Sequence, residues 1–270
     1  MNSGEIRVKD GTRLSYKIWP GGEPSRPLPR IVLLHSLAMD HRFWIPVIER
    51  IDGAADVLAI DCRGHGASDK PAGPYTVEVF ADDLAAVMDD ASWPKALVAG
   101  CSMGGCVALA FAKAFPERVE ALGLIDTTAY YGDDAPKVWE ERAQKSAEGG
   151  MEKLIGFQKS RWFGDAFRDA NPDVVEAAIA VFLANDIPAY GETCRMLGAC
   201  DLRAAMPNFN FSTRVIVGEE DYAAPVAMAE AMRDAIPGAS LLVIDKVRHL
   251  TPLEIPDLIA GELMALSEKI

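Results

Sequence analysis

The sequence predicts an α/β protein with a mostly parallel, doubly wound sheet and an inserted helical lid. Two observations lead to this prediction. Short apolar runs alternate with helical patterns along most of the chain, and in one long stretch only helical patterns occur. Runs of strand length with almost no polar residues are typical of parallel strands that are covered on both faces. A chain of 270 residues can bury a core of this kind without disulfides or a structural metal.

The predicted strands fall into two groups. Residues 5–9 and 13–19 alternate between polar and apolar side chains, and Asp10-Gly11 between them is typical of a β-hairpin. Residues 21–30 are rich in Gly and Pro and predict a loop. Strands of the parallel part are predicted at six apolar runs: residues 31–35, 57–60, 96–100, 121–125, 215–217 and 241–244.

Helical patterns separate the apolar runs. In residues 77–90, Val77, Phe80 and Leu84 recur at spacings of three and four, and acidic residues occupy the opposite face. Three further helices are predicted between or after the strands, at residues 105–114, 223–235 and 256–267. Strands that alternate with helices indicate βαβ units and therefore a doubly wound sheet.

The alternation stops between residues 130 and 208. No strand pattern occurs there, and helices are predicted at residues 135–148, 151–161, 172–183 and 190–200. A helical insertion within an α/β chain indicates a lid over the sheet. We therefore expect an α/β core of residues 1–129 and 209–270 and a helical cap of residues 130–208.

Composition narrows the classes of partner. The chain has 27 basic and 40 acidic residues, and its net charge of −13 argues against nucleic acid and anionic membranes as partners. Five cysteines without a CxxC pair, and an N-terminus without an apolar signal region, favour a cytoplasmic protein. The uncharged residues 96–112 are short for a membrane span and are interrupted by glycines. The expected partner is a small molecule, and the oligomeric state stays open, a homo-oligomer included.

Residues 100–105, Gly-Cys-Ser-Met-Gly-Gly, lie between a predicted strand and a predicted helix. In a G-x-S-x-G motif of this kind the chain turns sharply, and the serine is held at the tip of the turn. Gly100 and Gly104 carry no Cβ that would clash in such a turn. The helix that follows directs backbone N–H groups towards developing negative charge. The motif predicts Ser102 as a catalytic nucleophile.

A serine hydroxyl needs a neighbouring base, and the base needs an acid that orients it. In chains with this elbow motif, the order is serine, then acid, then histidine. His249 is the one histidine after Ser102, and it follows the last predicted strand. Three acids follow the strand at residues 215–217. Asp221 is favoured by its distance from the strand end, with Glu220 as the alternative.

These motifs resemble those of the α/β-hydrolase superfamily over nearly the whole chain. His35-Ser36-Leu37 is similar to its His-Gly-X segment, residues 61–68 to its D-x-R-G-x-G-x-S segment, and residues 218–221 and 249–256 to its acid and histidine loops. Within the superfamily, residues 33–37, followed by Asp40, Arg42 and Trp44, look most like 3-oxoadipate enol-lactonases. His35 and Ala38 differ from the Asn and Gly that are common in those lactonases.

The resemblance implies an oxyanion hole formed by the backbone N–H groups of Leu37 and Met103. It also implies a substrate pocket under the lid. Arg161 or Arg195 would bind a substrate carboxylate there, as the diacid of an enol-lactone requires. The pocket residues expected from the sequence are Ser36, Trp139, Arg161, Trp162 and Arg195.

The expected activity is hydrolysis of a small carboxylic ester or lactone through an acyl-enzyme, with no cofactor and no metal. C–C bond hydrolysis and cofactor-free perhydrolase or haloperoxidase chemistry are alternatives on the same triad, because Met103-Gly104-Gly105 also occurs in perhydrolase relatives. A non-catalytic ligand receptor on a hydrolase fold is a more remote alternative. Haloalkane dehalogenases and epoxide hydrolases are disfavoured, since those relatives carry Asp at the position of Ser102.

Overall fold

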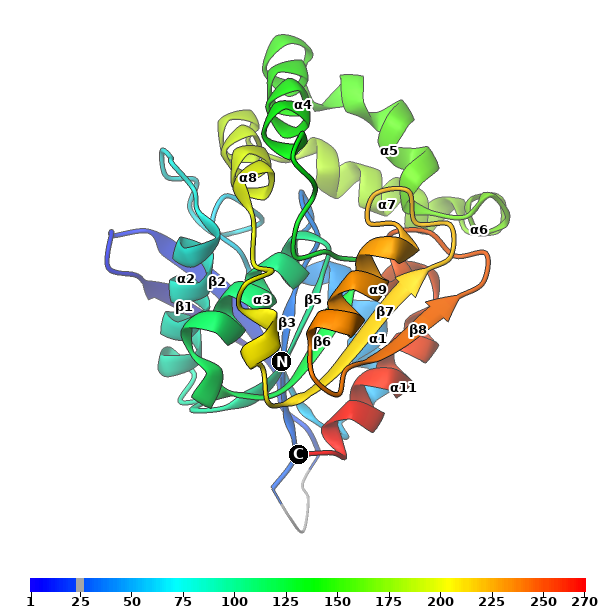
Figure 1. The fold of residues 1–270 in the computed structure, drawn as a ribbon. Coiled ribbons are helices and arrows are strands. Elements are labelled where there is room, and N and C mark those ends of the chain that lie inside the picture. Colours follow the sequence, from blue (N-terminus) through cyan, green and yellow to red (C-terminus); the bar gives the residue numbers. More distant parts are fainter. Residues whose placement is uncertain (23–26) are drawn as a thin grey trace.

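The computed structural model describes residues 1–22 and 27–270. Within these residues eight strands form one sheet in the order β1-β2-β4-β3-β5-β6-β7-β8 (Figure 1). The pairs β1–β2 and β2–β4 are antiparallel, and all pairs from β4 to β8 are parallel. The strands are β1 (Asn2–Arg7), β2 (Arg13–Trp19), β3 (Arg30–Leu34), β4 (Asp56–Asp61), β5 (Ala96–Cys101), β6 (Val119–Ile125), β7 (Ser212–Gly218) and β8 (Ser240–Ile244).

Helices cover both faces of the sheet, as Figure 1 shows. On one face, α2 packs against α3, and α9 packs against β7 and β8; on the other, α1 packs against α11. The helices of this core are α1 (Ile45–Ile51), α2 (Val77–Asp90), α3 (Met103–Ala114), α9 (Val226–Ala235), α10 (Thr251–Glu254) and α11 (Pro256–Ser267). The predicted doubly wound α/β fold is confirmed.

The apolar runs and the hairpin signal predicted the strands well. Each of the six runs coincides with a strand of the parallel part, apart from His35, which follows the end of β3, because side chains covered on both faces must be apolar. The hairpin is present, and Gly11 adopts the left-handed φ of +87° that its turn requires. Its first strand begins at Asn2 and ends at Arg7, earlier than expected. Of the predicted loop at 21–30, residues 23–26 lie outside the described part of the chain.

The predicted helical lid is confirmed between β6 and β7. Its helices are α4 (Ala135–Gly149), α5 (Ile155–Trp162), α6 (Asp165–Ala170), α7 (Pro172–Leu183) and α8 (Ile187–Ala199). Residues 151–154 form a 3₁₀ helix where an α-helix was predicted, and α6 was not predicted. The helix α8 begins three residues early because the Asp186 side chain caps it by accepting a hydrogen bond from the Ala189 N–H.

The lid lies over the sheet edge at which the parallel strands end, opposite the two chain termini (Figure 1). The segments that enter and leave it are joined, because Tyr130 pairs with Asp201 and the Leu202 N–H donates to the Ala129 carbonyl at 2.9 Å. The bounds of 130 and 208 for the cap stay a prediction.

Among the described residues, no single helix is both long and apolar enough to cross a bilayer. The pair α7 and α8, bent by 98°, meets that criterion together by length and composition alone.

The turn between β5 and α3 depends on glycines that approach other backbone closely. A Cβ on Gly100 would lie 2.1 Å from the Gly104 carbonyl oxygen, and a Cβ on Gly104 would lie 2.1 Å from that of Leu34. Both contacts are with backbone, which cannot move aside cheaply. A Cβ added to Gly261, in the middle of α11, would have no atom of the described residues within 4 Å.

Gly104→Ala and Gly261→Ala therefore form a matched pair of helix substitutions with opposite effects. We expect Gly104→Ala to lower the free energy of unfolding by at least about 2 kcal/mol through overpacking. Gly261→Ala should raise it by about 0.5–1 kcal/mol, since Ala is the better helix former. Urea denaturation measures both. Equal effects of the two substitutions would contradict the close approach at the elbow.

Candidate active site

Ser102 occupies the tip of the turn between β5 and α3. Its backbone has φ 55° and ψ −116°, a region that residues with a side chain rarely adopt. Two hydrogen bonds hold it there: the Ser102 N–H donates to the Ile125 carbonyl at 2.9 Å, and the Thr127 hydroxyl donates to the Ser102 carbonyl at 2.7 Å. The strained turn thus points the serine side chain outward from the ends of the strands. Side chains of other loops can reach it there.

His249 and Asp221 reach Ser102 from loops after β8 and β7. His249 Nε2 lies 2.9 Å from Ser102 Oγ, and His249 Nδ1 lies 2.8 Å from Asp221 Oδ2. With Nδ1 facing a carboxylate, that nitrogen carries the proton, and the Nε2 lone pair faces the hydroxyl. The structure thus brings together the three residues expected from the sequence. Glu220, the alternative acid, contacts Arg248 Nε at 3.2 Å instead.

The environment of Asp221 keeps it ionised. Burial disfavours its charge, but the His249 ring and the backbone N–H groups of Ala224 and Ala223 outweigh this and lower the pKa of the carboxyl below its usual value. Those N–H groups donate to Asp221 Oδ1 at 2.9 and 2.7 Å. A charged Asp221 can orient the imidazole and stabilise its cation.

Asp126 is a buried carboxyl beneath these residues that the sequence reasoning missed. It accepts hydrogen bonds from the Thr251 N–H at 3.0 Å, the Thr251 hydroxyl at 2.7 Å and the Gly218 N–H at 3.2 Å. The Cys101 thiol lies 3.8 Å away. Burial and the neighbouring Asp221 raise the pKa of Asp126 well above its usual value. Asp126 thus joins the ends of β5, β6 and β7 to the loop that follows His249.

The backbone N–H groups expected to form an oxyanion hole have no acceptor within the described residues. Met103 is the first residue of α3, and Leu37 is buried in the loop after β3. His35 braces this loop: its Nε2 accepts from the Cys62 N–H at 3.0 Å, and its Nδ1 donates to the Ser36 carbonyl at 2.8 Å. Burial lowers the pKa of His35, which keeps the ring neutral and suited to this pair of bonds.

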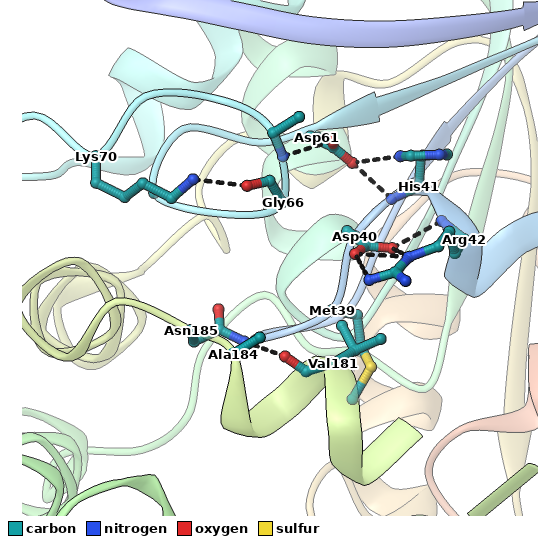
Figure 2. A pocket seen from close by; sticks show the side chains of 12 residues that line it. Met39, Asp40, His41, Arg42, Asp61, Gly66, Lys70, Val181, Ala184 and Asn185 are labelled. Carbon is teal, nitrogen blue, oxygen red and sulfur yellow. Dashed lines mark hydrogen bonds and ion pairs between the residues drawn. The ribbon is translucent and has the colours of Figure 1, made fainter. Parts of the chain in front are cut away.

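The lid also contacts the loop after β3. Asn185, just beyond α7, donates from its amide to the Ala38 carbonyl at 2.8 Å and to the Val181 carbonyl at 2.9 Å. Figure 2 shows the bond to Val181, with Met39 of the loop close by. The backbone of Ala38 is itself left-handed, with φ 61°. The lid therefore helps to fix the shape of the loop that presents the Leu37 N–H.

Asp40, His41 and Asp61 border the small cavity of about 320 Å³ in Figure 2, and their ligand atoms lie within 4.8 Å of one another. These groups are already used. Arg42 pairs with Asp40 at 2.6 Å, and Asp61 accepts from the His41 N–H, the His41 ring and the Ala67 N–H at 2.7–2.9 Å. The arrangement is a network of internal hydrogen bonds, and we assign no metal to it.

A larger cavity of about 760 Å³ opens beside Ser102, between the lid and the core. Four of the five pocket residues expected from the sequence line it: Ser36, Trp139, Arg161 and Trp162. Sequence reasoning missed several others, among them Tyr131, Arg142, Gln158 and Tyr222. Helical spacing carried a signal for one of these, since Arg142 follows Trp139 by three residues on α4 and therefore shares its face.

Arg195 does not reach this cavity, which corrects its assignment as a pocket residue. Its guanidinium pairs with Glu140 of α4 and Glu192 of α8, both at 2.7 Å, on the exposed side of the lid. The periodicity of a helix shows which residues share a face, but it does not show which face meets the core. Here the ion pairs with Glu140 and Glu192 hold the Arg195 side chain on the exposed face.

Arg142 and Arg161 are the guanidinium groups that the lid presents to the cavity. Within the described chain neither is in an ion pair. Arg142 donates to the Tyr190 hydroxyl at 2.6 Å and stacks on Trp139, 5.0 Å from the ring centroid. Partial burial and the Arg142 cation lower the pKa of Arg161 below the usual arginine value. With Lys145 and Lys153, the two arginines outnumber the two carboxylates of the cavity lining, Asp134 and Glu141, and this excess of positive charge favours an anionic ligand.

The amino-acid sequence matches a known protein family. A family model described as alpha/beta hydrolase fold matches residues 29–256. The chain belongs to the α/β-hydrolase family. The fold class and the family expected from the sequence are both confirmed, and the enol-lactonase relatives support hydrolase activity.

Individual α/β hydrolases are similar over nearly their full length. The 3-oxoadipate enol-lactonase 2 of Acinetobacter baylyi is 28% identical over 84% of either chain. The crystal structure of the enol-lactonase from Burkholderia xenovorans LB400 is 33% identical, with a TM-score of 0.91, and covers 97% of this chain and 99% of that one. A thermophilic esterase from Thermogutta terrifontis, with malate bound, is 25% identical with a TM-score of 0.91, over 100% and 99% of the two chains. Among α/β hydrolases, the protein is enol-lactonase-like.

Proposed function

We propose that the protein hydrolyses a carboxylic ester or lactone through an acyl-enzyme formed on Ser102. The observation that carries the proposal is the continuous hydrogen-bonded chain from Ser102 through His249 to Asp221, at the wall of a cavity large enough for a substrate. Similarity to enol-lactonases and an esterase supports the same class of bond.

In the first half-reaction Ser102 Oγ attacks the substrate carbonyl while His249 Nε2 accepts the hydroxyl proton. The same nitrogen then gives this proton to the departing alkoxide or enolate oxygen, which leaves an acyl group on Ser102. Asp221 stabilises the imidazolium that exists between these transfers. Water, activated by His249 in the same manner, releases the carboxylic acid and restores Ser102.

The negative charge that develops on the carbonyl oxygen would be bound by the N–H groups of Leu37 and Met103. Each donor of this kind typically stabilises a transition state by about 3 kcal/mol. The strained backbone of Ser102 and the lid contact to Ala38 both act on these donors, since Met103 follows the first and Leu37 precedes the second.

The substrate would carry a free carboxylate as well as the ester bond. 3-Oxoadipate is a dicarboxylic acid, so the enol-lactone named for the Acinetobacter relatives keeps one carboxylate after ring closure. The Thermogutta esterase was solved with malate, also a dicarboxylate. In this chain Arg142 and Arg161 are the groups suited to bind that carboxylate, because both line the cavity and neither has an ion-pair partner among the described residues.

A substrate panel on the wild type and Ser102→Ala tests the reaction class. Nitrophenyl esters and 3-oxoadipate enol-lactone should be hydrolysed, with a burst of product before steady turnover if deacylation is slow. Ser102→Ala should lower kcat by about 10⁴-fold or more, because the nucleophile is lost.

Full esterase activity in Ser102→Ala would refute the mechanism. A diketone cleaved faster than every ester and lactone would indicate C–C bond hydrolysis on the same triad. Peracid formation from acetate and peroxide without ester turnover would indicate a perhydrolase.

Replacing each of the two cavity arginines by the uncharged Met tests whether they bind a substrate carboxylate. We expect Arg142→Met and Arg161→Met each to raise KM for an anionic lactone by about 10-fold to 100-fold, the cost of one lost charged hydrogen bond. KM for a neutral acetate ester should change little. Arg195→Met, whose guanidinium is paired outside the cavity, is the control and should leave both constants unchanged. An unaltered KM for the anionic substrate in both cavity variants would exclude this binding mode.

A further inference from the structure

Arg248 immediately precedes His249, and its guanidinium contacts two other segments of the chain. Its Nη1 lies 2.8 Å from the Ser160 carbonyl, 3.1 Å from the Phe163 carbonyl and 2.9 Å from Asp165 Oδ1. Its Nε donates to Glu220 Oε2 at 3.2 Å. The side chain is only 10% exposed, so these partners replace water almost completely.

Three of these four partners, Ser160, Phe163 and Glu220, adjoin residues of the proposed site. Ser160 and Phe163 bracket Arg161 and Trp162, which line the cavity at the end of α5. Glu220 precedes Asp221 in the acid loop. One guanidinium therefore connects the histidine loop, the acid loop and the cavity wall supplied by the lid.

Backbone contacts strengthen the same junction. The Leu250 N–H donates to the Trp162 carbonyl at 3.0 Å. Glu254 accepts from the Gly164 N–H at 3.0 Å with one oxygen and from the Arg248 N–H at 3.3 Å with the other. The end of α5 is thus bonded to the loop of His249 on both sides of the histidine.

We propose that Arg248 is a positioning residue that fixes the cavity wall formed by the end of α5 relative to His249. Arg248 does not line the cavity and acts through the residues it holds. Its effect is to keep two distances constant together, one from His249 to Ser102 and one from Arg161 to Ser102. This inference rests on the proposed function, in which His249 is the base and Arg161 binds a substrate carboxylate.

We call this fixed placement of Arg161 relative to the triad the registration. It matters only for a substrate that contacts both the triad and the cavity wall at the end of α5. A nitrophenyl acetate requires the triad and the oxyanion hole but makes no contact with Arg161. A nitrophenyl monoester of glutaric acid also carries a distal carboxylate that can reach Arg161. The ratio of kcat/KM for the glutarate ester to that for the acetate ester therefore reports the registration, whereas a general loss of folded protein lowers both values equally.

We expect Arg248→Met to lower this ratio by at least 10-fold. Arg248→Lys, which keeps the charge but reaches fewer acceptors, should restore part of the loss. The matched control is Arg214→Met, since Arg214 forms a partly buried ion pair with Glu262 at 2.6 Å, away from the cavity. That control should lose stability and leave the ratio unchanged.

Amide hydrogen exchange supplies a readout that does not need turnover. Arg248→Met should accelerate exchange at residues 160–165 and 247–251 together, because the bonds between them are lost. Should the full substitution fail to fold, Asp165→Asn and Glu220→Gln each remove the negative charge of one acceptor, and Asp165→Asn should lower the ratio by about threefold.

An unchanged ratio in folded Arg248→Met, or an equal change in Arg214→Met, would overturn the positioning role. Unchanged exchange in both segments would overturn it regardless of activity. Failure of the proposed function appears elsewhere, as wild-type protein inactive on both esters or as activity that survives Ser102→Ala, while the exchange measurement still decides the role of Arg248.

Discussion

The left-handed backbone of Ser102 is the constraint on which the rest of the site depends. A residue held in such a region costs of order 1–3 kcal/mol, and it persists only where the surroundings define it fully. Here Gly100 and Gly104 make room for the close approach of backbone, and Ile125 and Thr127 hold the main chain by hydrogen bonds. The strain is useful because the same turn presents the hydroxyl to the cavity and begins α3 with an N–H that has no acceptor among the described residues.

Two loops from distant parts of the chain must then meet this turn, and buried polar groups hold them there. Parallel strands end at one edge, which brings the loops after β7 and β8 to the turn after β5 without fixing them precisely enough for catalysis. Asp126 accepts hydrogen bonds from Gly218 and Thr251 and so joins the ends of these two loops. Arg248 donates hydrogen bonds to Glu220 and to the end of α5. The lid is therefore part of the site's framework as well as its cover.

Local sequence signals accounted for most of the fold. The helix α2 agrees with its prediction at both ends because Thr76 caps it and its apolar face is regular. The helix α1 was missed, since seven residues after a 3₁₀ turn give too short a pattern. The early start of α8 came from the cap formed by Asp186, a signal that lies outside the apolar periodicity.

Residues of the site could be predicted only where chemistry left few choices. Ser102 and His249 follow from a motif and from chain order, whereas Asp221 competed with Glu220 until the structure showed which carboxylate faces the imidazole. Arg195 was misassigned because the packing of α4 against α8 cannot be deduced from either helix alone. Asp126 and Arg248 were missed because most of their partners lie 83 to 125 residues away in the chain.

Covalent labelling tests the central claim most directly. The protein is treated with an alkyl fluorophosphonate, which reacts with a serine activated by histidine, and its peptides are mapped by mass spectrometry while hydrolysis is followed in parallel. The account predicts one adduct, on Ser102, loss of hydrolysis in proportion to labelling, and no labelling in His249→Ala. Complete labelling of Ser102 with hydrolysis intact, or an adduct on a different serine that accompanies the loss of activity, would contradict it.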